Sequence, residues 1–246
     1  MIPAVNIGPF VLPTAAFVYI IGAWLCLSLA ERSATWLNLD ADNMSGLVST
    51  GLIAGVVGAR LTFVATYWSS YQENFLGIIW PINSGFNPLG GLFFSVAAMF
   101  FYGRYKQMDL GPTLDALAPI FVTGLIIVSL ADFLGGPGFG TATNLPWGIE
   151  QFGIRRHPVQ LYEIGIGLLA LLTWWFFRNR RDFDGQLFLV TSAVYCFGRL
   201  FLDAFRANAW LSSGGWHILQ ILFLFITLGC IILLAIGLRP VDQAIE

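Results

Sequence analysis

Six ionisable side chains lie inside long apolar stretches of the chain, and these are the first places to look for chemistry. They are Arg60, Asp115, Asp132, Glu163, Arg199 and Asp203. An ionisable group at the centre of a bilayer costs at least ~2.5 kcal/mol, so it is usually paired or kept for a function. Arginine carries five donors in a planar fork that suits a phosphate. The phosphate at hand in a bilayer belongs to a phospholipid, so these residue types predict a site for an anionic head group.

Arg199 is the residue on which we expect the head group to bind. Arg199 and Asp203 are four residues apart, so they share a helix face and are placed to form an ion pair. Two interpretations stay open: a pair that only fixes helix packing, or an arginine that keeps donors for an anion. Glu163 begins a later apolar stretch and is a plausible partner for Arg60 or Arg199.

Three further polar residues precede Glu163 in the segment RHPVQLYE and extend the candidate lipid-binding set. They are His157, Gln160 and Tyr162. His157 also fits a simpler role as a hydrogen-bonding residue at the entry of a helix. His217 stands next to Trp216 at the start of the last apolar stretch, where we expect both to anchor the chain at the membrane interface.

The composition places most of the chain in lipid. Hydrophobic residues make up 57%, charged residues 11%, and the mean hydropathy is +0.75, whereas soluble domains carry about 25% charged residues. No basic cluster suggests a nucleic-acid partner. Cys26, Cys196 and Cys230 lie in apolar stretches without the spacing of a metal site, so we expect neither metal nor cofactor. We predict a single membrane domain over residues 1–246.

The apolar stretches predict an all-α integral membrane protein with about seven transmembrane helices. The candidate spans are about 11–30, 45–68, 88–103, 113–134, 158–177, 185–205 and 216–237, judged against the ~20 residues that a helix needs to cross the bilayer. The segment PINSGFNPLGG at 81–91 is too rich in proline and glycine to continue a helix. We therefore predict a short interfacial or re-entrant segment near 74–84.

The basic residues predict the orientation of these spans. With the N-terminus outside, seven basic residues lie on the cytoplasmic side: Arg32, Arg104, Lys106, Arg178, Arg180, Arg181 and Arg239. Three lie outside: Arg155, Arg156 and Arg206. The excess of positive charge on the inner side favours an N-terminus outside and a C-terminus in the cytoplasm.

At this point the chain resembles the prolipoprotein diacylglyceryl transferases. Four segments carry the resemblance: GVVGARLTFV at 55–64, LGGLF at 89–93, LPWGI followed by RHPVQLYE at 145–163, and GRLFLDAFR at 198–206. The resemblance implies a multi-pass protein of the bacterial inner membrane that works in lipoprotein biosynthesis. The implied reaction transfers diacylglyceryl from phosphatidylglycerol to a cysteine of a lipoprotein precursor. It needs no metal or nucleotide.

The resemblance implies roles for several positions of this chain. Arg199 matches a head-group arginine of the family, and Asp203 stands where the family has a glutamate. The implied lipid-binding residues that are retained are Arg60, Arg199, His157, Gln160, Tyr162 and Glu163. Asp132 stands where the family has an asparagine and is either a base or a structural partner of Arg60 or Arg199. Arg199, Asp203 and Asp132 are thus the candidate catalytic residues.

Other family positions are replaced in this chain. Ala15, Leu89, Ser129 and Pro137 stand where the family has tyrosine, histidine, arginine and glutamate. A missing acid–base group costs about 10²- to 10⁴-fold in rate, so these replacements weigh against the family reaction. They favour a member that holds a phospholipid without catalysis. Two alternatives stay open: an active transferase with an altered site, and a catalytically silent subunit of a larger membrane complex.

Overall fold

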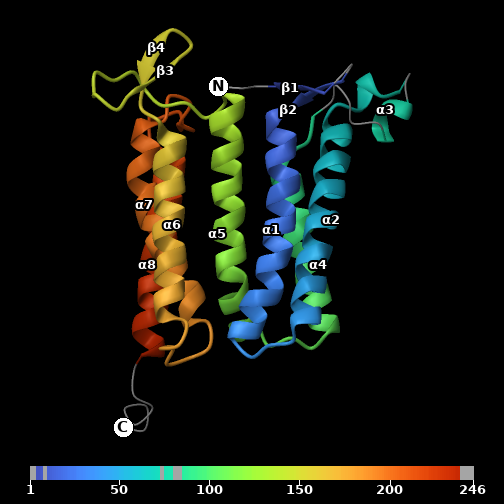
Figure 1. Ribbon diagram of the computed structural model, residues 1–246, viewed down its shortest axis with the longest axis vertical. Helices are drawn as coiled ribbons and strands as arrows, with labels where there is room; N and C mark the ends of the chain where they lie inside the picture. The colour runs from blue at the N-terminus through green and yellow to red at the C-terminus, as the bar shows by residue number, and fades with distance from the viewer. Residues whose placement is uncertain (1–3, 8–9, 73–74, 80–84, 239–246) are drawn as a thin grey trace. The chain divides into compact units, whose positions relative to one another are not determined.

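The computed structural model describes residues 4–7, 10–72, 75–79 and 85–238 and is mostly helical (Figure 1). Its α-helices are α1 Thr14–Trp36, α2 Ala41–Thr66, α3 Leu76–Ile79, α4 Pro88–Tyr105, α5 Leu110–Gly135, α6 Val159–Phe177, α7 Gln186–Leu202 and α8 Ile218–Gly237. Two 3₁₀ turns, η1 Trp68–Ser70 and η2 Asp203–Phe205, extend α2 and α7. The helical class predicted from the apolar stretches is confirmed.

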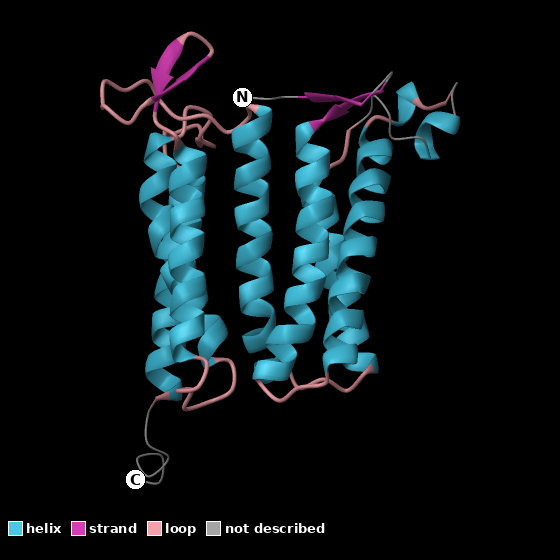
Figure 2. Ribbon diagram, in the orientation of Figure 1, coloured by secondary structure: helices cyan, strands magenta, loops and turns pink. Residues whose placement is uncertain are grey.

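Two short antiparallel hairpins, which the all-α prediction did not include, accompany the helices (Figure 2). One pairs β1 Ala4–Ile7 with β2 Phe10–Pro13, and the other pairs β3 Ile149–Gln151 with β4 Ile154–Arg156. The second hairpin lies in the segment between α5 and α6. It therefore stands beside the residues of RHPVQLYE, which begin α6.

Six helices are long and apolar enough to cross a membrane within the described residues: α1, α2, α5, α6, α7 with its 3₁₀ extension, and α8. The remaining predicted span, about 88–103, coincides with α4, which has 18 residues and carries Arg104 in its last turn, and it does not join these six. The predicted segment near 74–84 falls partly outside the described residues. Its described part contains the single turn of α3. The orientation of the termini stays a prediction.

The chain packs as two compact units, and each is described by itself. The first unit comprises Met1–Leu29 and Gly111–Glu246, and the second comprises Ala30–Leu110. The single domain predicted over 1–246 stays a prediction. In the second unit, α2 packs against α4 through glycines. A Cβ on Gly91 would lie 2.9 Å from the carbonyl oxygen of Gly55, and a Cβ on Gly58 would meet Phe94 at 2.3 Å. Such small residues let two membrane helices approach closely.

In the first unit, α6, α7 and α8 lie side by side (Figure 1). A buried cluster of Val122, Ala170, Tyr195 and Cys196 joins α5, α6 and α7. Gly198 on α7 admits the side chain of Ile166, because a Cβ there would approach it to 2.6 Å. These contacts hold α5, α6 and α7 together, so that polar side chains near their ends lie close to one another.

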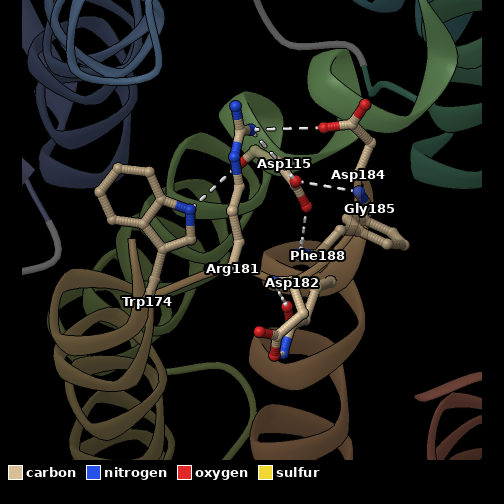
Figure 3. A network of polar contacts seen from close by, with 8 residues as sticks. Asp115, Trp174, Arg181, Asp182, Asp184, Gly185 and Phe188 are labelled. Carbon is tan, nitrogen blue, oxygen red and sulfur yellow. Dashed lines mark hydrogen bonds and ion pairs between the residues drawn. The ribbon is translucent and has the colours of Figure 1, made fainter. Parts of the chain in front are cut away.

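Asp115 on α5 caps the start of α7, as Figure 3 shows. Its side chain is wholly buried, and its carboxylate accepts hydrogen bonds from the backbone N–H groups of Gly185 and Phe188, both at 2.9 Å. Arg181 lies 3.7 Å from the same carboxylate, and Trp174 donates to the Asp115 backbone carbonyl at 2.8 Å. A carboxylate at a helix N-terminus satisfies donors that the helix leaves unpaired. Asp115 is therefore a structural residue that fixes α7 to α5 and α6.

We expect Asp115→Asn to destabilise the fold, because an amide would present N–H to one of two buried N–H donors. Bonds to a charged acceptor contribute about 1.5–3 kcal/mol each, so the free energy of unfolding should fall by about 2–3 kcal/mol. Thermal unfolding in detergent measures the change. The exposed Asp109→Asn is the matched control. Equal melting temperatures for the two variants would contradict this capping role.

Candidate functional site

Glu163, in the first turns of α6, is the centre of a buried polar cluster. Its side chain is 3% exposed. One oxygen, Oε1, forms an ion pair with Arg199 and accepts a hydrogen bond from Nε of Arg206 at 3.0 Å. The other, Oε2, accepts from the hydroxyl of Ser129 at 2.8 Å. Two guanidinium groups thus share one carboxylate, and of the two partners expected for Glu163, Arg60 and Arg199, the structure shows Arg199.

Three elements of the chain bring these groups together. Ser129 lies near the end of α5, Glu163 in the first turns of α6, and Arg199 near the end of α7. Arg206 directly follows the 3₁₀ turn η2, which links it to the end of α7 and so brings both arginines to Glu163. The charged trio of Glu163, Arg199 and Arg206 therefore joins α6 to the end of α7.

The predicted ion pair between Arg199 and Asp203 is wrong. The described residues contain no such pair, because Arg199 turns to Glu163 instead. Asp203 is wholly buried, and its Oδ2 lies 3.1 Å from Nδ1 of His217 on the neighbouring α8 segment. A carboxylate on another helix has proved the better partner for Arg199 than the one four residues along its own helix.

Three buried polar atoms of this cluster have no hydrogen-bond partner among the described residues: Nε of Arg199, Oδ1 of Asp203 and Oε1 of Gln160. Buried polar groups are nearly always satisfied, so each such atom calls for an explanation. Arg199 also lies over the ring of Phe223, with 5.4 Å from Cζ to the ring centroid. The arrangement leaves one N–H donor of a buried guanidinium unused.

The residues of RHPVQLYE fasten the segment between α5 and α6. Gln160 donates to the backbone carbonyl of Pro137 at 3.0 Å, and the hydroxyl of Tyr162 accepts from Trp147 at 2.8 Å. The ring of His157 packs 4.9 Å from that of Phe205, which lies in η2. These contacts account for the three side chains structurally, and their predicted lipid binding stays a prediction.

Asp132 lies one turn after Ser129 on α5 and is partly buried. Its side chain makes no hydrogen bond or ion pair within the described part of the chain, so the predicted pair with Arg199 is absent. Arg206 and Glu163 are the charged groups whose fields reach it. A Cβ on Gly138 would stand 3.2 Å from Oδ2 of Asp132 and 3.8 Å from Nη2 of Arg206, so both groups flank that glycine.

In the second unit, the side chain of Arg60 is held by hydrogen bonds to the backbone. Its guanidinium donates to the carbonyl groups of Gly77, Ile78 at 3.0 Å and Gly85 at 2.9 Å. The ring of Tyr71 lies 5.5 Å from its Cζ. Arg60 therefore holds the chain segment before α4, a role that occupies all three of its nitrogens. Its predicted lipid binding stays a prediction.

Sequence reasoning missed two members of the cluster. Arg206 was counted with the basic residues outside the membrane, yet its side chain is only 17% exposed and binds Glu163. Its place at the end of the segment GRLFLDAFR was the available signal. His217 was expected as an interfacial anchor, and the pairing with Asp203 that the structure shows was not predicted. No spacing rule marks it, because the two residues meet only through the packing of α8 on α7.

We expect Glu163→Gln to destabilise the first unit, because it leaves two buried guanidinium groups without their carboxylate. Removing one partner of a buried ion pair typically costs about 3–5 kcal/mol. Thermal unfolding in detergent and hydrogen exchange at the start of α6 and the end of α7 measure the effect. The exposed Glu150→Gln on β3 serves as the control. Unchanged exchange at both helix ends would show that the trio does not hold them.

Comparison with known proteins confirms the resemblance that the motifs carry. The family model for prolipoprotein diacylglyceryl transferase matches residues 3–236. The phosphatidylglycerol–prolipoprotein diacylglyceryl transferase of Finegoldia magna is 28% identical over 87% of this chain and 86% of its own length. The protein of the same name from Campylobacter curvus is 35% identical over 67% of this chain and 64% of its own length. The protein of the same name from Oleidesulfovibrio alaskensis is 28% identical over 98% of this chain and 94% of its own length. With six candidate spans, these matches identify a multi-pass protein of the bacterial inner membrane.

Proposed function

Because the chain belongs to the prolipoprotein diacylglyceryl transferase family, we propose that it binds an anionic phospholipid head group, with the phosphate on Arg199 and Arg206. The relatives are named for phosphatidylglycerol, which makes that lipid the first candidate. One observation carries the proposal: Nε of Arg199 is buried and has no acceptor among the described residues. A phosphate oxygen is the acceptor that a guanidinium fork suits.

The charges of the trio support the same ligand. Glu163 is one carboxylate shared by two guanidinium groups, so Glu163, Arg199 and Arg206 together carry one net positive charge, with Asp132 as a further carboxylate near Arg206. An unpaired charge away from water is costly, and a phosphodiester anion would neutralise it. Ser129 supports this arrangement, because its hydroxyl occupies Oε2 of Glu163 and leaves the arginines to share Oε1. The two arginines are therefore held close together by Glu163 before any ligand binds.

The family's own residues for the transfer reaction are replaced at several positions. Leu89 is an alkyl side chain, 72% exposed on the first turn of α4, and takes up no proton. Ser129 donates to Glu163 where the family has a positive charge, and Pro137 offers a backbone carbonyl to Gln160 where the family has an acid. Transfer to a lipoprotein precursor would need other residues of this chain. A silent subunit of a larger membrane complex remains the alternative to it.

The lipid-binding proposal is tested by the lipids that the protein retains. We expect Arg199→Gln and Arg206→Gln each to lower retained phosphatidylglycerol by about tenfold or more, because charge-assisted hydrogen bonds contribute about 1.5–3 kcal/mol each. The protein is reconstituted in nanodiscs of phosphatidylglycerol and phosphatidylcholine, extracted, and its bound lipids are quantified by mass spectrometry. The exposed Arg155→Gln on β4 is the matched control. Equal retention by all three variants refutes the assignment.

Asp132→Asn tests the position of the head group relative to α5. A carboxylate roughly 8 Å from a phosphate costs about 2 kcal/mol at an effective dielectric constant of 20. We therefore expect the amide variant to retain more phosphatidylglycerol, on the order of tenfold, with phosphatidylcholine unchanged. The same nanodisc assay measures both lipids. A fall in phosphatidylglycerol, or a parallel rise in both lipids, would place Asp132 away from the phosphate.

A further inference from the structure

The pair formed by Asp203 and His217 has the geometry of an oriented base. Nδ1 of His217 lies 3.1 Å from Oδ2 of Asp203, whose side chain is wholly buried, while the side chain of His217 is 32% exposed. A carboxylate that accepts from Nδ1–H fixes the ring and leaves Nε2 as the proton acceptor. Nε2 makes no hydrogen bond within the described residues. The exposed edge of the ring is thus the basic one.

The backbone around the pair holds it beside the arginines. The N–H of Asp203 donates to the carbonyl of Arg199, and the N–H of Arg206 donates to the carbonyl of Asp203 at 3.2 Å. Asp203 therefore sits on one turn between the two residues proposed to bind phosphate. On the other side, Ile218 donates to the carbonyl of Trp210 at 3.0 Å and fixes the chain at His217.

A purely structural ion pair explains this arrangement less well. A wholly buried carboxylate needs several hydrogen bonds, yet Oδ1 of Asp203 has none in the described part of the chain. Two arginines on the same helix end, Arg199 and Arg206, both turn to Glu163. Asp203 is left with a titratable partner that reaches the surface. In acid–base sites the roles are often divided in this way: one group, here Asp203, holds the ring in place, and the ring, here His217, transfers the proton.

We propose that His217, oriented by Asp203, is the base that activates a thiol for attack on the lipid held by Arg199 and Arg206. The inference rests on the proposed lipid binding. Nε2 of His217 takes the proton as the S–H bond breaks, and the sulfur forms a bond to the terminal glycerol carbon of the diacylglyceryl group. The C–O bond to the phosphate breaks and its electron pair stays on that oxygen. Glycerol phosphate leaves, and the proton passes from His217 to the phosphate.

The experiment measures two quantities on the full-length protein in phosphatidylglycerol nanodiscs. One is the rate at which a peptide with a single cysteine gains diacylglyceryl as a thioether, followed by mass spectrometry together with glycerol phosphate release. The other is retained phosphatidylglycerol, which reports both folding and lipid binding. We expect His217→Gln to lower the transfer rate by 10²- to 10⁴-fold, with lipid retention within about twofold of the unchanged protein.

Asp203 acts through His217 and is tested as a positioning residue. Asp203→Asn should lower the transfer rate, because an amide does not hold the Nδ1–H form of the ring, whereas Asp203→Glu should restore at least a tenth of it. Trp216→Phe, beside His217 and 69% exposed, should leave the rate unchanged and serves as the local control.

The two readouts separate this inference from the lipid-binding proposal. If His217→Gln transfers at the normal rate, or if the unchanged protein makes no thioether while retaining phosphatidylglycerol, the base assignment is overturned and lipid binding stands. Glycerol phosphate release without thioether would also overturn it, because water would then be the nucleophile. If phosphatidylglycerol is not retained by the unchanged protein, the lipid-binding proposal fails first.

Discussion

The carboxylate of Glu163, shared between two guanidinium groups, is the interaction on which the first unit depends. In apolar surroundings none of these charges is tolerable alone, so the residues that carry them must meet. They come from α6 and from the end of α7, and Ser129 adds α5. At the opposite end of α7, Asp115 on α5 caps the first N–H groups of the helix. Helix α7 is therefore located at both ends by carboxylates that belong to its neighbours.

This arrangement sorts the intramembrane charges by what their partners are. Arg60 and Asp115 form hydrogen bonds to backbone groups, and such bonds order chain segments. Arg199 and Asp203 meet side chains and each keep one buried atom without a partner. The type of an intramembrane charged residue therefore indicates little about function until its contacts are known, since two of the six candidates here, Arg60 and Asp115, bind backbone groups.

The sequence predicted the helices well, because length and hydropathy alone decide whether a stretch can cross a bilayer. It predicted the pairing of charges poorly. The four-residue spacing of Arg199 and Asp203 satisfies a rule for isolated helices, but a carboxylate on α6 competes for the same arginine. Arg206 was assigned to the outer side of the membrane and not to the site, because the positive-inside rule uses a residue's position along the chain and not its contacts. The hairpin β3–β4 was missed because its strands have three residues each, too few for a periodic pattern.

Two acids, Glu163 and Asp203, show how the groups around a carboxylate decide its role. Glu163 faces two cations that do not titrate, so its task is to hold them in place. Asp203 faces one imidazole, a side chain that can both donate and accept hydrogen bonds. The backbone of one turn carries Asp203 between the two arginines. The proposed phosphate contacts therefore belong to the end of α7 and the turn after it, whereas the proposed proton acceptor, His217, belongs to the start of α8.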